Sequence, residues 1–419
     1  MSKKHFERYN GNFEPSSTGR IFVDTPGQFN LSSINILYSS LDTVRQLYKL
    51  RLKTGFVEAL GDALEGVPAG KVVYSFAGYK WMLRRGGASG YQYMLQNAEL
   101  GLVLLIKTRY ATLESIGTHL KIEVSPKLIF DNTPENLQLL LDSFADMIAL
   151  DSMYHQAGVA VHLACDLQGW EPPQDFASKL TCRSRRITDR SGISELSLDT
   201  DICSVYGAGQ SYLFGSASSL QFALYNKTKE SKCSDKLDYF LDRWNAKTTD
   251  FLKPLYNPEE TVWRAEVRFS HSVVNQFASA NDVKLNSFES IIAHLGGLWR
   301  YALNNFRYDY SRTYIHPVWT VLMEESGFDQ FETGFVYRRE YKTPGIGNEK
   351  NVALALGNML SIYARNKFSA QKALECVKES GIYLDLVGYF RSRGLDKSDI
   401  YEFIQKGLSD RWLASKVAA

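Results

Sequence analysis

Two strand-like runs, 219–227 (SLQFALYNK) and 261–270 (TVWRAEVRFS), carry side chains that could attack a phosphodiester. Side chains two residues apart on a strand share a face, so Tyr225 and Lys227 are expected on the polar face of the first run. The second run places Arg264, Glu266 and Arg268 on one face and apolar side chains on the other. A phenol could act as the nucleophile, and the cations could stabilise the charge that builds up on the phosphate.

Two further runs have the same alternation of apolar and polar residues. In 158–168 (GVAVHLACDLQ) His162 and Asp166 lie opposite the apolar face, and in 118–130 (THLKIEVSPKLIF) the polar positions are His119, Lys121 and Glu123. Any one of these strands fits an ordinary half-exposed sheet with a wet face. Four of them together favour a site, because carboxylates and a histidine on one sheet suit Mg²⁺ or Mn²⁺.

The order of three segments resembles a known family. VAVHLACDLQG, then SYLFGSASSLQFALYNKTKE, then WRAEVRF is similar to the trans-acting rolling-circle replication initiators of small plasmids and filamentous phages. That family shows an R-x-D-x-A-x-D strand, a Y-x-G-S-x-x-S hairpin leading to Y-[DNE]-K-x-x-E, and an R-x-E-x-R strand. The likeness covers roughly residues 70–310 and rests mainly on YNKTKE and WRAEVRF in the right order.

The resemblance implies a role for each matching residue. Tyr225 corresponds to the tyrosine that nicks DNA, Lys227 to the cation of its motif and Glu230 to the last residue of that motif. Asp166 and Glu266 correspond to the acidic strand positions that would hold Mg²⁺ or Mn²⁺. The implied reaction nicks one strand of origin DNA, leaving a 5′-phosphotyrosine and a 3′-OH that primes synthesis.

The sequence also departs from the family pattern. His162 stands where the family has its first Asp, and Ala160 replaces the Arg. Histidine can still bind Mn²⁺, so we predict His162 as a third ligand beside Asp166 and Glu266. A simple cross-strand ion pair remains an alternative for Glu266. Two other tyrosines compete for the role of nucleophile and lie in FRYDYSRTY, namely Tyr308 and Tyr310.

Contacts with DNA are expected from local clusters, because the formal net charge is only +2. The densest cluster is 179–190 (KLTCRSRRITDR), with Arg183, Arg185 and Arg186 as phosphate contacts. Arg264 and Arg268 are expected to touch DNA as well. A basic run that is simply solvated is the alternative.

Three functions remain open at this point. The resemblance favours a replication initiator that binds duplex and single-stranded origin DNA and leaves unwinding and synthesis to a host helicase and polymerase. A mobilisation relaxase would use the same chemistry. A DNA-binding regulator with a degenerate, non-nicking site is the alternative from another class, and the histidine at position 162 is its best support.

The patterns predict an α+β fold, with a central antiparallel sheet, a polar active-site face, helices on the other face and a helical C-terminal part. We expect a flexible arm over 1–18, a nicking domain over 19–315, and a mostly helical region over 316–419 that could bind DNA. Antiparallel hairpins are expected between 71 and 107, and a helix capped by Thr133 with Pro134 at its first position. One long helix or two are expected over 32–64, from the helical spacing of Ile34, Leu37, Leu41, Val44, Leu47 and Leu50.

Bulk composition narrows the class of protein. The five cysteines are scattered without a CxxC pair, which argues against structural zinc and against a disulfide framework. The N-terminus lacks the apolar core of a signal peptide, and no apolar run reaches the roughly 18 residues that span a bilayer. We therefore expect a cytoplasmic protein of the bacterial host without membrane contact. The oligomeric state is left open.

Overall fold

The computed structural model of the chain describes residues 3–9, 19–67, 70–86, 90–108, 116–182, 187–189, 211–234, 236–246, 248–249, 253–328, 335–339, 349–391 and 396–416.

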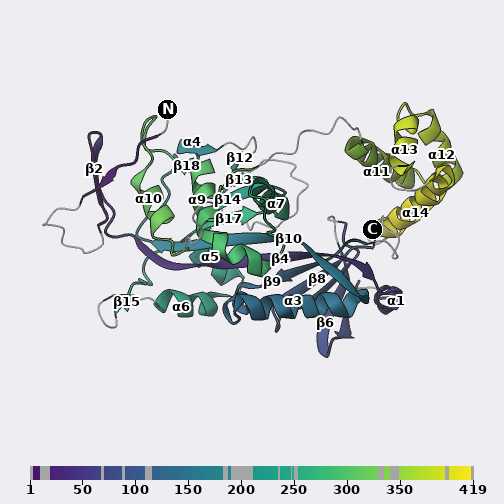
Figure 1. Cartoon of the computed structure of the whole chain (residues 1–419), viewed down its shortest axis with the longest axis horizontal. Helices are drawn as coiled ribbons and strands as arrows, with labels where there is room; N and C mark the ends of the chain where they lie inside the picture. The colour runs from purple at the N-terminus through teal and green to yellow at the C-terminus, as the bar shows by residue number, and fades with distance from the viewer. Residues whose placement is uncertain are drawn as a thin grey trace. The chain divides into compact units, whose positions relative to one another are not determined.

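One antiparallel sheet of eleven strands organises the first 340 residues (Figure 1). Its spatial order is β12 (Ile187–Asp189), β13 (Ser211–Gly215), β14 (Leu220–Asn226), β17 (Trp263–Phe269), β10 (Ala149–Gln168), β4 (Asn35–Leu52), β9 (Gly117–Val124), β8 (Leu102–Ile106), β7 (Tyr93–Asn97), β6 (Tyr79–Arg85) and β5 (Lys71–Phe76). Each strand runs antiparallel to its neighbours. The predicted fold class and the hairpins between 71 and 107 are thus confirmed.

The strand β4 replaces the helix that was predicted over 32–64, and that prediction was wrong. Pairing with β10 skips Leu37 and Asp42, so each forms a β-bulge. A bulge adds one residue to a strand and shifts which later residues face inward. Two such shifts within one strand spread its buried positions at spacings of three and four, which imitates a helix. Only the last part of the segment is helical, as α1 (Thr54–Ala63).

Helices cover the apolar face of the sheet. Figure 1 shows α7 (His271–Ala280), α9 (Leu295–Asn305) and α10 (Pro317–Glu324) on the same side of β10. Their buried side chains share one core with those of the strands, including Phe222, Val267, Phe277, Trp299 and Trp319. Burying this apolar area supplies the main favourable term for folding.

The helix α3 (Pro134–Ile148) packs against β10 and β4. Thr133 caps it by accepting a hydrogen bond from the Asn136 amide, and Pro134 occupies its first turn, as predicted. The strand predicted over 118–130 ends earlier, at Val124, because Ser125 caps a short helix, α2 (Pro126–Phe130). Proline suits the first turn of a helix because its missing amide would have no partner there.

Two helices also cover part of the opposite, polar face. They are α5 (Lys227–Cys233) and α6 (Leu237–Asn245), and α6 packs on β4. Phe240 and Trp244 of α6 form a small apolar cluster with Leu37 and Val262, separate from the main core. The polar side chains nearby are therefore enclosed between a sheet and a helix.

Short elements complete the first unit. Near the N-terminus, three short strands form a small sheet: β1 (Glu7–Arg8), β2 (Ile21–Asp24) and β3 (Gly27–Asn30). Phe6 is buried in the main core, so this part of the predicted flexible arm is packed, while residues 10–18 lie outside the described ones. The remaining connections contain α4 (Phe176–Lys179), β11 (Leu180–Cys182), β15 (Thr248–Thr249), β16 (Lys253–Pro254), α8 (Phe288–Ile291), a 3₁₀ helix (Ile292–His294) and β18 (Phe306–Tyr308).

The chain divides into two compact units, Met1–Glu340 and Tyr341–Ala419. The division falls later than the predicted boundary after residue 315, because α10 is buried in the core of the first unit. The second unit is helical, as predicted, with its own apolar core of Leu356, Leu360, Val377, Phe390 and Ile404. Its helices are α11 (Glu349–Arg365), α12 (Ala370–Glu379), α13 (Tyr383–Arg391) and α14 (Lys397–Lys416). Among the described residues we find no helix with the length and apolar character that crossing a bilayer requires.

Candidate active site on the polar face of the sheet

The register of β14, β17 and β10 lines up the predicted residues in three neighbouring rows. Tyr225, Arg264 and Asp166 form one row. The row at the other end contains Gln221, Arg268 and His162. Between them Glu266 has Ala223 on one side and Ala164 on the other. Both flanking side chains are therefore small, and Glu266 itself is buried.

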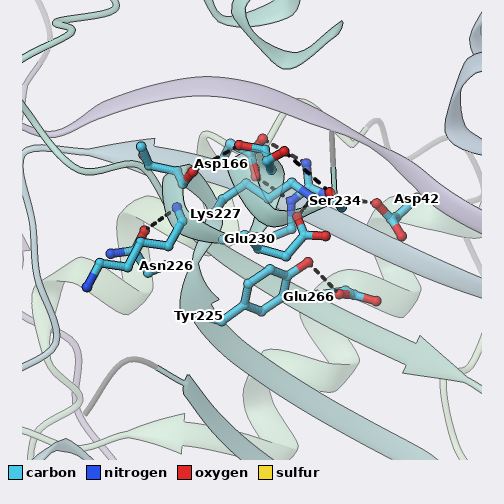
Figure 2. A network of polar contacts seen from close by, with 12 residues as sticks. Asp42, Asp166, Tyr225, Asn226, Lys227, Glu230, Ser234 and Glu266 are labelled. Carbon is cyan, nitrogen blue, oxygen red and sulfur yellow. Dashed lines mark hydrogen bonds and ion pairs between the residues drawn. The ribbon is translucent and has the colours of Figure 1, made fainter. Parts of the chain in front are cut away.

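Tyr225 and Glu266 are in direct contact. The Tyr225 hydroxyl donates a hydrogen bond of 3.0 Å to Glu266 Oε2, which is the dashed line between these two side chains in Figure 2. Burial, followed by the charge of Glu266, raises the pKa of Tyr225 well above its ordinary value. The phenol is therefore protonated at neutral pH and needs an acceptor before it can attack as a nucleophile.

Glu266 is held ionised by its other neighbours. Burial alone would raise the pKa of this carboxyl, but Arg268 and His162 hold it well below the usual range. Arg268 donates from Nε to Oε1 at 2.8 Å and from Nη2 to Oε2 at 3.2 Å. His162 Nδ1 lies 3.4 Å from Oε1. Burial lowers the pKa of His162, which keeps its imidazole neutral and able to bind a metal.

Asp42 joins Glu266 and His162 from the neighbouring strand. One ligand atom from each of these three residues lies within 4.8 Å of the others. Two carboxylates and an imidazole are a donor set that fits Mn²⁺, and Mg²⁺ less closely because of the nitrogen ligand. The sequence reasoning missed Asp42, because it was assigned to a helix. It is a bulged residue of β4, and bulges often redirect a side chain beside an active site.

Asp166 is placed apart from this cluster. Both of its oxygens are already engaged, Oδ1 by Arg264 Nε at 2.6 Å and Oδ2 by Arg264 Nη2 at 2.8 Å and by the Trp244 indole at 2.9 Å. Asp166 and Arg264 are both fully buried. The structure therefore gives Asp42 the place at the cluster that was expected for Asp166. Burial also corrects the expectation that Arg264 contacts DNA.

Lys227 and Glu230 lie next to Tyr225 but not on the strand. The strand β14 ends at Asn226, whose side chain caps α5 by accepting from the Lys229 amide, so Lys227 is the first residue of the helix (Figure 2). Lys227 pairs with Glu230, and its Nζ lies 4.0 Å from the centre of the Phe240 ring. Burial, and next the charge of Arg264, lower the pKa of Lys227.

A cavity of about 630 Å³ opens beside these groups. Asp42, Tyr225, Glu230, Glu266 and Arg268 all line it. Its other walls come from the turn between β7 and β8, from the start of α2 and from Tyr239 and Phe240 of α6. The candidate nucleophile Tyr225, its acceptor Glu266 and Asp42 of the candidate metal cluster therefore border one space.

Among the remaining predicted residues that the structure describes, Tyr308, Tyr310 and His119 do not line this cavity. Arg183, Arg185 and Arg186 lie outside the described residues. Tyr308 is buried against Phe176 on the other side of the sheet, and Tyr310, 38% exposed, packs on the N-terminal Phe6. Of the weaker polar positions, His119 bonds the Lys107 carbonyl at 2.7 Å. Glu123 lines the cavity and pairs with Arg45 and Lys121.

Comparison with known proteins gives a relative from a phage. No protein-family profile matches the chain, and no solved structure matches it. The uncharacterized protein ORF430 of Pseudomonas phage Pf1 is 38% identical over 420 residues, which covers 96% of this chain and 95% of that protein. Identity at this level over nearly the whole length of both proteins shows common descent, so this chain belongs to the same family as the phage Pf1 protein.

Proposed function

We propose that this protein nicks one strand of DNA with Tyr225 as the nucleophile. The Tyr225 oxygen forms a bond to the scissile phosphorus, and the bond from phosphorus to the 3′ oxygen breaks. The products are a 5′-phosphotyrosine and a 3′ oxygen that takes up a proton to become a 3′-OH. The observation that carries the proposal is the 3.0 Å hydrogen bond from Tyr225 to Glu266 at the edge of the cavity.

Glu266 takes the phenolic proton in this proposal. It is ionised and already accepts the hydrogen bond of the nucleophile. Because its pKa is low, Glu266 is a weak base, so the developing phenolate needs stabilisation by nearby cations. Lys227 supplies such a charge, with Nζ 5.9 Å from the centre of the Tyr225 ring.

The phosphate would be held by a metal at the candidate cluster and by Arg268. Asp42, His162 and Glu266 would bind Mn²⁺ or Mg²⁺, which would act as a Lewis acid on a phosphate oxygen. Glu266 has two oxygens, so it can accept from Tyr225 and serve as a ligand at once. Arg268 lines the cavity and is partly exposed, so among the described arginines it is the one we assign to DNA contact.

The biological role that fits this chemistry is initiation of rolling-circle replication. The phosphotyrosine keeps the energy of the broken bond, so the strand can be rejoined later without ATP, and the 3′-OH can prime a polymerase. Origin DNA, a host helicase and a host polymerase are the partners in this proposal. A mobilisation relaxase would carry out the same reaction. Descent shared with a phage protein is compatible with either role.

A nicking assay tests the proposed function. The full-length protein is incubated with supercoiled DNA that carries its own coding region, with Mn²⁺, and the products are examined for nicked circles bound covalently to protein. We expect adducts from the wild-type protein, and none with chelator. DNA binding without nicks or adducts would instead support the regulator with a degenerate site. That second function is favoured by one observation: Arg268 and Arg264 already neutralise Glu266 and Asp166.

The basic segment 179–190 allows a separate test of DNA binding. Replacing Arg183, Arg185 and Arg186 with Ala should flatten the log–log salt dependence by about two to three units, since each phosphate contact on duplex DNA contributes roughly −0.9. Binding to all sequences should weaken alike. If the salt dependence of binding is unchanged in this variant, the three arginines do not contact DNA.

A further inference from the structure

Arg264 connects three strands of the sheet through one buried guanidinium group. It lies on β17 and binds Asp166 of β10 with Nε and Nη2. Its remaining nitrogen, Nη1, donates to Asp42 Oδ1 of β4 at 2.6 Å. Arg264 is fully buried, whereas 21% of the Asp42 side chain is exposed. Arg264 therefore links its buried partner Asp166 to Asp42, a member of the candidate metal cluster.

Asp42 depends on this contact for its orientation. As a bulged residue it has no direct partner across β10, so strand pairing does not fix its side chain in the way it fixes Glu266. Among the described residues, Thr43 also contacts the Asp42 carboxylate, donating to Oδ2 at 3.3 Å. Arg264 makes the shorter and charge-assisted bond, so it sets the direction in which the carboxylate points.

Asp166 completes the arrangement through its charge. A lone arginine beside Asp42 would oppose a metal cation in the same cluster. The fork-shaped pair with Asp166 offsets the positive charge of Arg264 and fixes its plane, with help from the Trp244 indole.

We propose that Arg264 and Asp166 are positioning residues that set the metal affinity of the cluster by orienting Asp42. The inference rests on the metal site of the proposed function and deepens it. Neither residue would bind the ion itself. Arg264 would hold the ligand Asp42 in place, and Asp166 would hold Arg264. Partners of metal ligands commonly change affinity by 10–100-fold when they are replaced.

The test measures binding of Mn²⁺ alone to metal-free, full-length protein, by the electron paramagnetic resonance signal of free Mn²⁺. Asp166→Asn keeps the shape of the side chain and removes its charge, and Arg264→Lys keeps the charge and removes the fork. We expect the Kd for Mn²⁺ to rise about tenfold or more in each variant. Asp142→Asn is the matched control. This half-buried aspartate of α3 accepts from Tyr48 at 2.6 Å and from Gln138 at 2.8 Å and is not a member of the cluster, so its replacement should leave the Kd unchanged.

Melting temperatures in chelator show whether each variant folds. If Arg264→Lys does not fold, Asp166→Asn decides the question, because it keeps the size and shape of the side chain and one accepting oxygen. A wild-type Kd in folded Asp166→Asn would overturn the inference. So would a wild-type or lower Kd in Arg264→Lys, since that result indicates that Asp166 is itself a ligand and competes with the arginine.

Two further variants separate this inference from the proposed function. Asp42→Asn and His162→Ala remove groups from the cluster itself and should abolish Mn²⁺ binding. If both bind Mn²⁺ normally, the metal site fails, and the inference fails with it. If both lose binding while Asp166→Asn keeps it, the site stands and only the positioning role is lost.

Discussion

The two arginines of the strand β17 lie four residues apart on one face and end in very different surroundings. Arg264 reaches across to Asp166 on the neighbouring strand, and the pair is closed off from solvent with Trp244 above it. Arg268 reaches back along its own strand to Glu266 and keeps 21% of its side chain exposed. We call these the closed end and the open end of the polar face.

The difference explains how one short motif can supply both support and chemistry. At the closed end both carboxylate oxygens of Asp166 are taken by neighbours inside the protein. At the open end the carboxylate of Glu266 borders the cavity and accepts from Tyr225 while two alanines flank it. The same pairing of arginine and carboxylate therefore fixes the site at one end and places a buried carboxylate beside the cavity at the other.

The largest expected effect is on stability at the closed end. Arg264→Met leaves the Asp166 charge buried without its partner and should lower the free energy of unfolding by about 3–5 kcal/mol. Arg268→Met should cost about 1–2 kcal/mol, because Glu266 keeps Tyr225 and His162 as donors. Urea unfolding in chelator measures both. Equal losses would contradict the distinction between the two ends.

A smaller effect is expected from metal at the open end. Mn²⁺ at about 100 times its Kd should raise the free energy of unfolding by about 2.7 kcal/mol, because it binds the folded protein. His162→Ala should remove this stabilisation, since the imidazole is a member of the cluster. The measurement is the melting temperature with and without Mn²⁺. If Mn²⁺ raises the melting temperature of His162→Ala as much as that of the wild type, the ion binds elsewhere.

The open end should also govern the dependence of stability on pH in the metal-free protein. The folded-state pKa of His162 lies below its ordinary 6.5, so its contribution is complete above pH 6.5 and is lost as the pH falls further. The pKa of Glu266 lies well below 4.5, so its contribution is complete above pH 4.5 and is lost as the pH falls through the folded-state value. Urea unfolding should therefore show declining stability from neutral to acid pH.

Two substitutions separate these contributions. His162→Gln should flatten the decline that begins below pH 6.5, and Glu266→Gln should flatten the part below pH 4.5. If both variants follow the wild-type curve, other groups control the acid sensitivity.

Part of this site could be predicted from the sequence, and the reason is the period of two in its strands. The alternation in 219–227 and 261–270 placed Tyr225 and Glu266 on polar faces, and the register confirms that these faces coincide. Asp42 could not be found in this way, because the bulge at its own position breaks the alternation and gives β4 the spacing of a helix. The partner of Asp166 also depends on which strands are neighbours, and alternation within one strand carries no information on that order.

For the overall fold, too, features with a local sequence signal could be predicted, and features that depend on tertiary packing could not. Strong local signals, such as the cap at Thr133 and the hairpins between 71 and 107, were confirmed. Boundaries set by burial were missed. The helix α10 follows residue 315, the predicted domain boundary, yet Val318 and Trp319 are buried in the core of the first unit. Only packing places it there.

The smallest expected effect on stability belongs to the residue with the largest effect on chemistry. Tyr225→Phe removes one hydrogen bond to Glu266, which keeps Arg268 and His162 as partners, so unfolding should change by about 1 kcal/mol or less. The most direct measurement is the yield of covalent protein–DNA adduct on nicked circles with Mn²⁺. We predict no adduct from Tyr225→Phe and wild-type yield from Tyr310→Phe and Tyr308→Phe. Adduct that persists in Tyr225→Phe and disappears in either of the other two would contradict Tyr225 as the nucleophile.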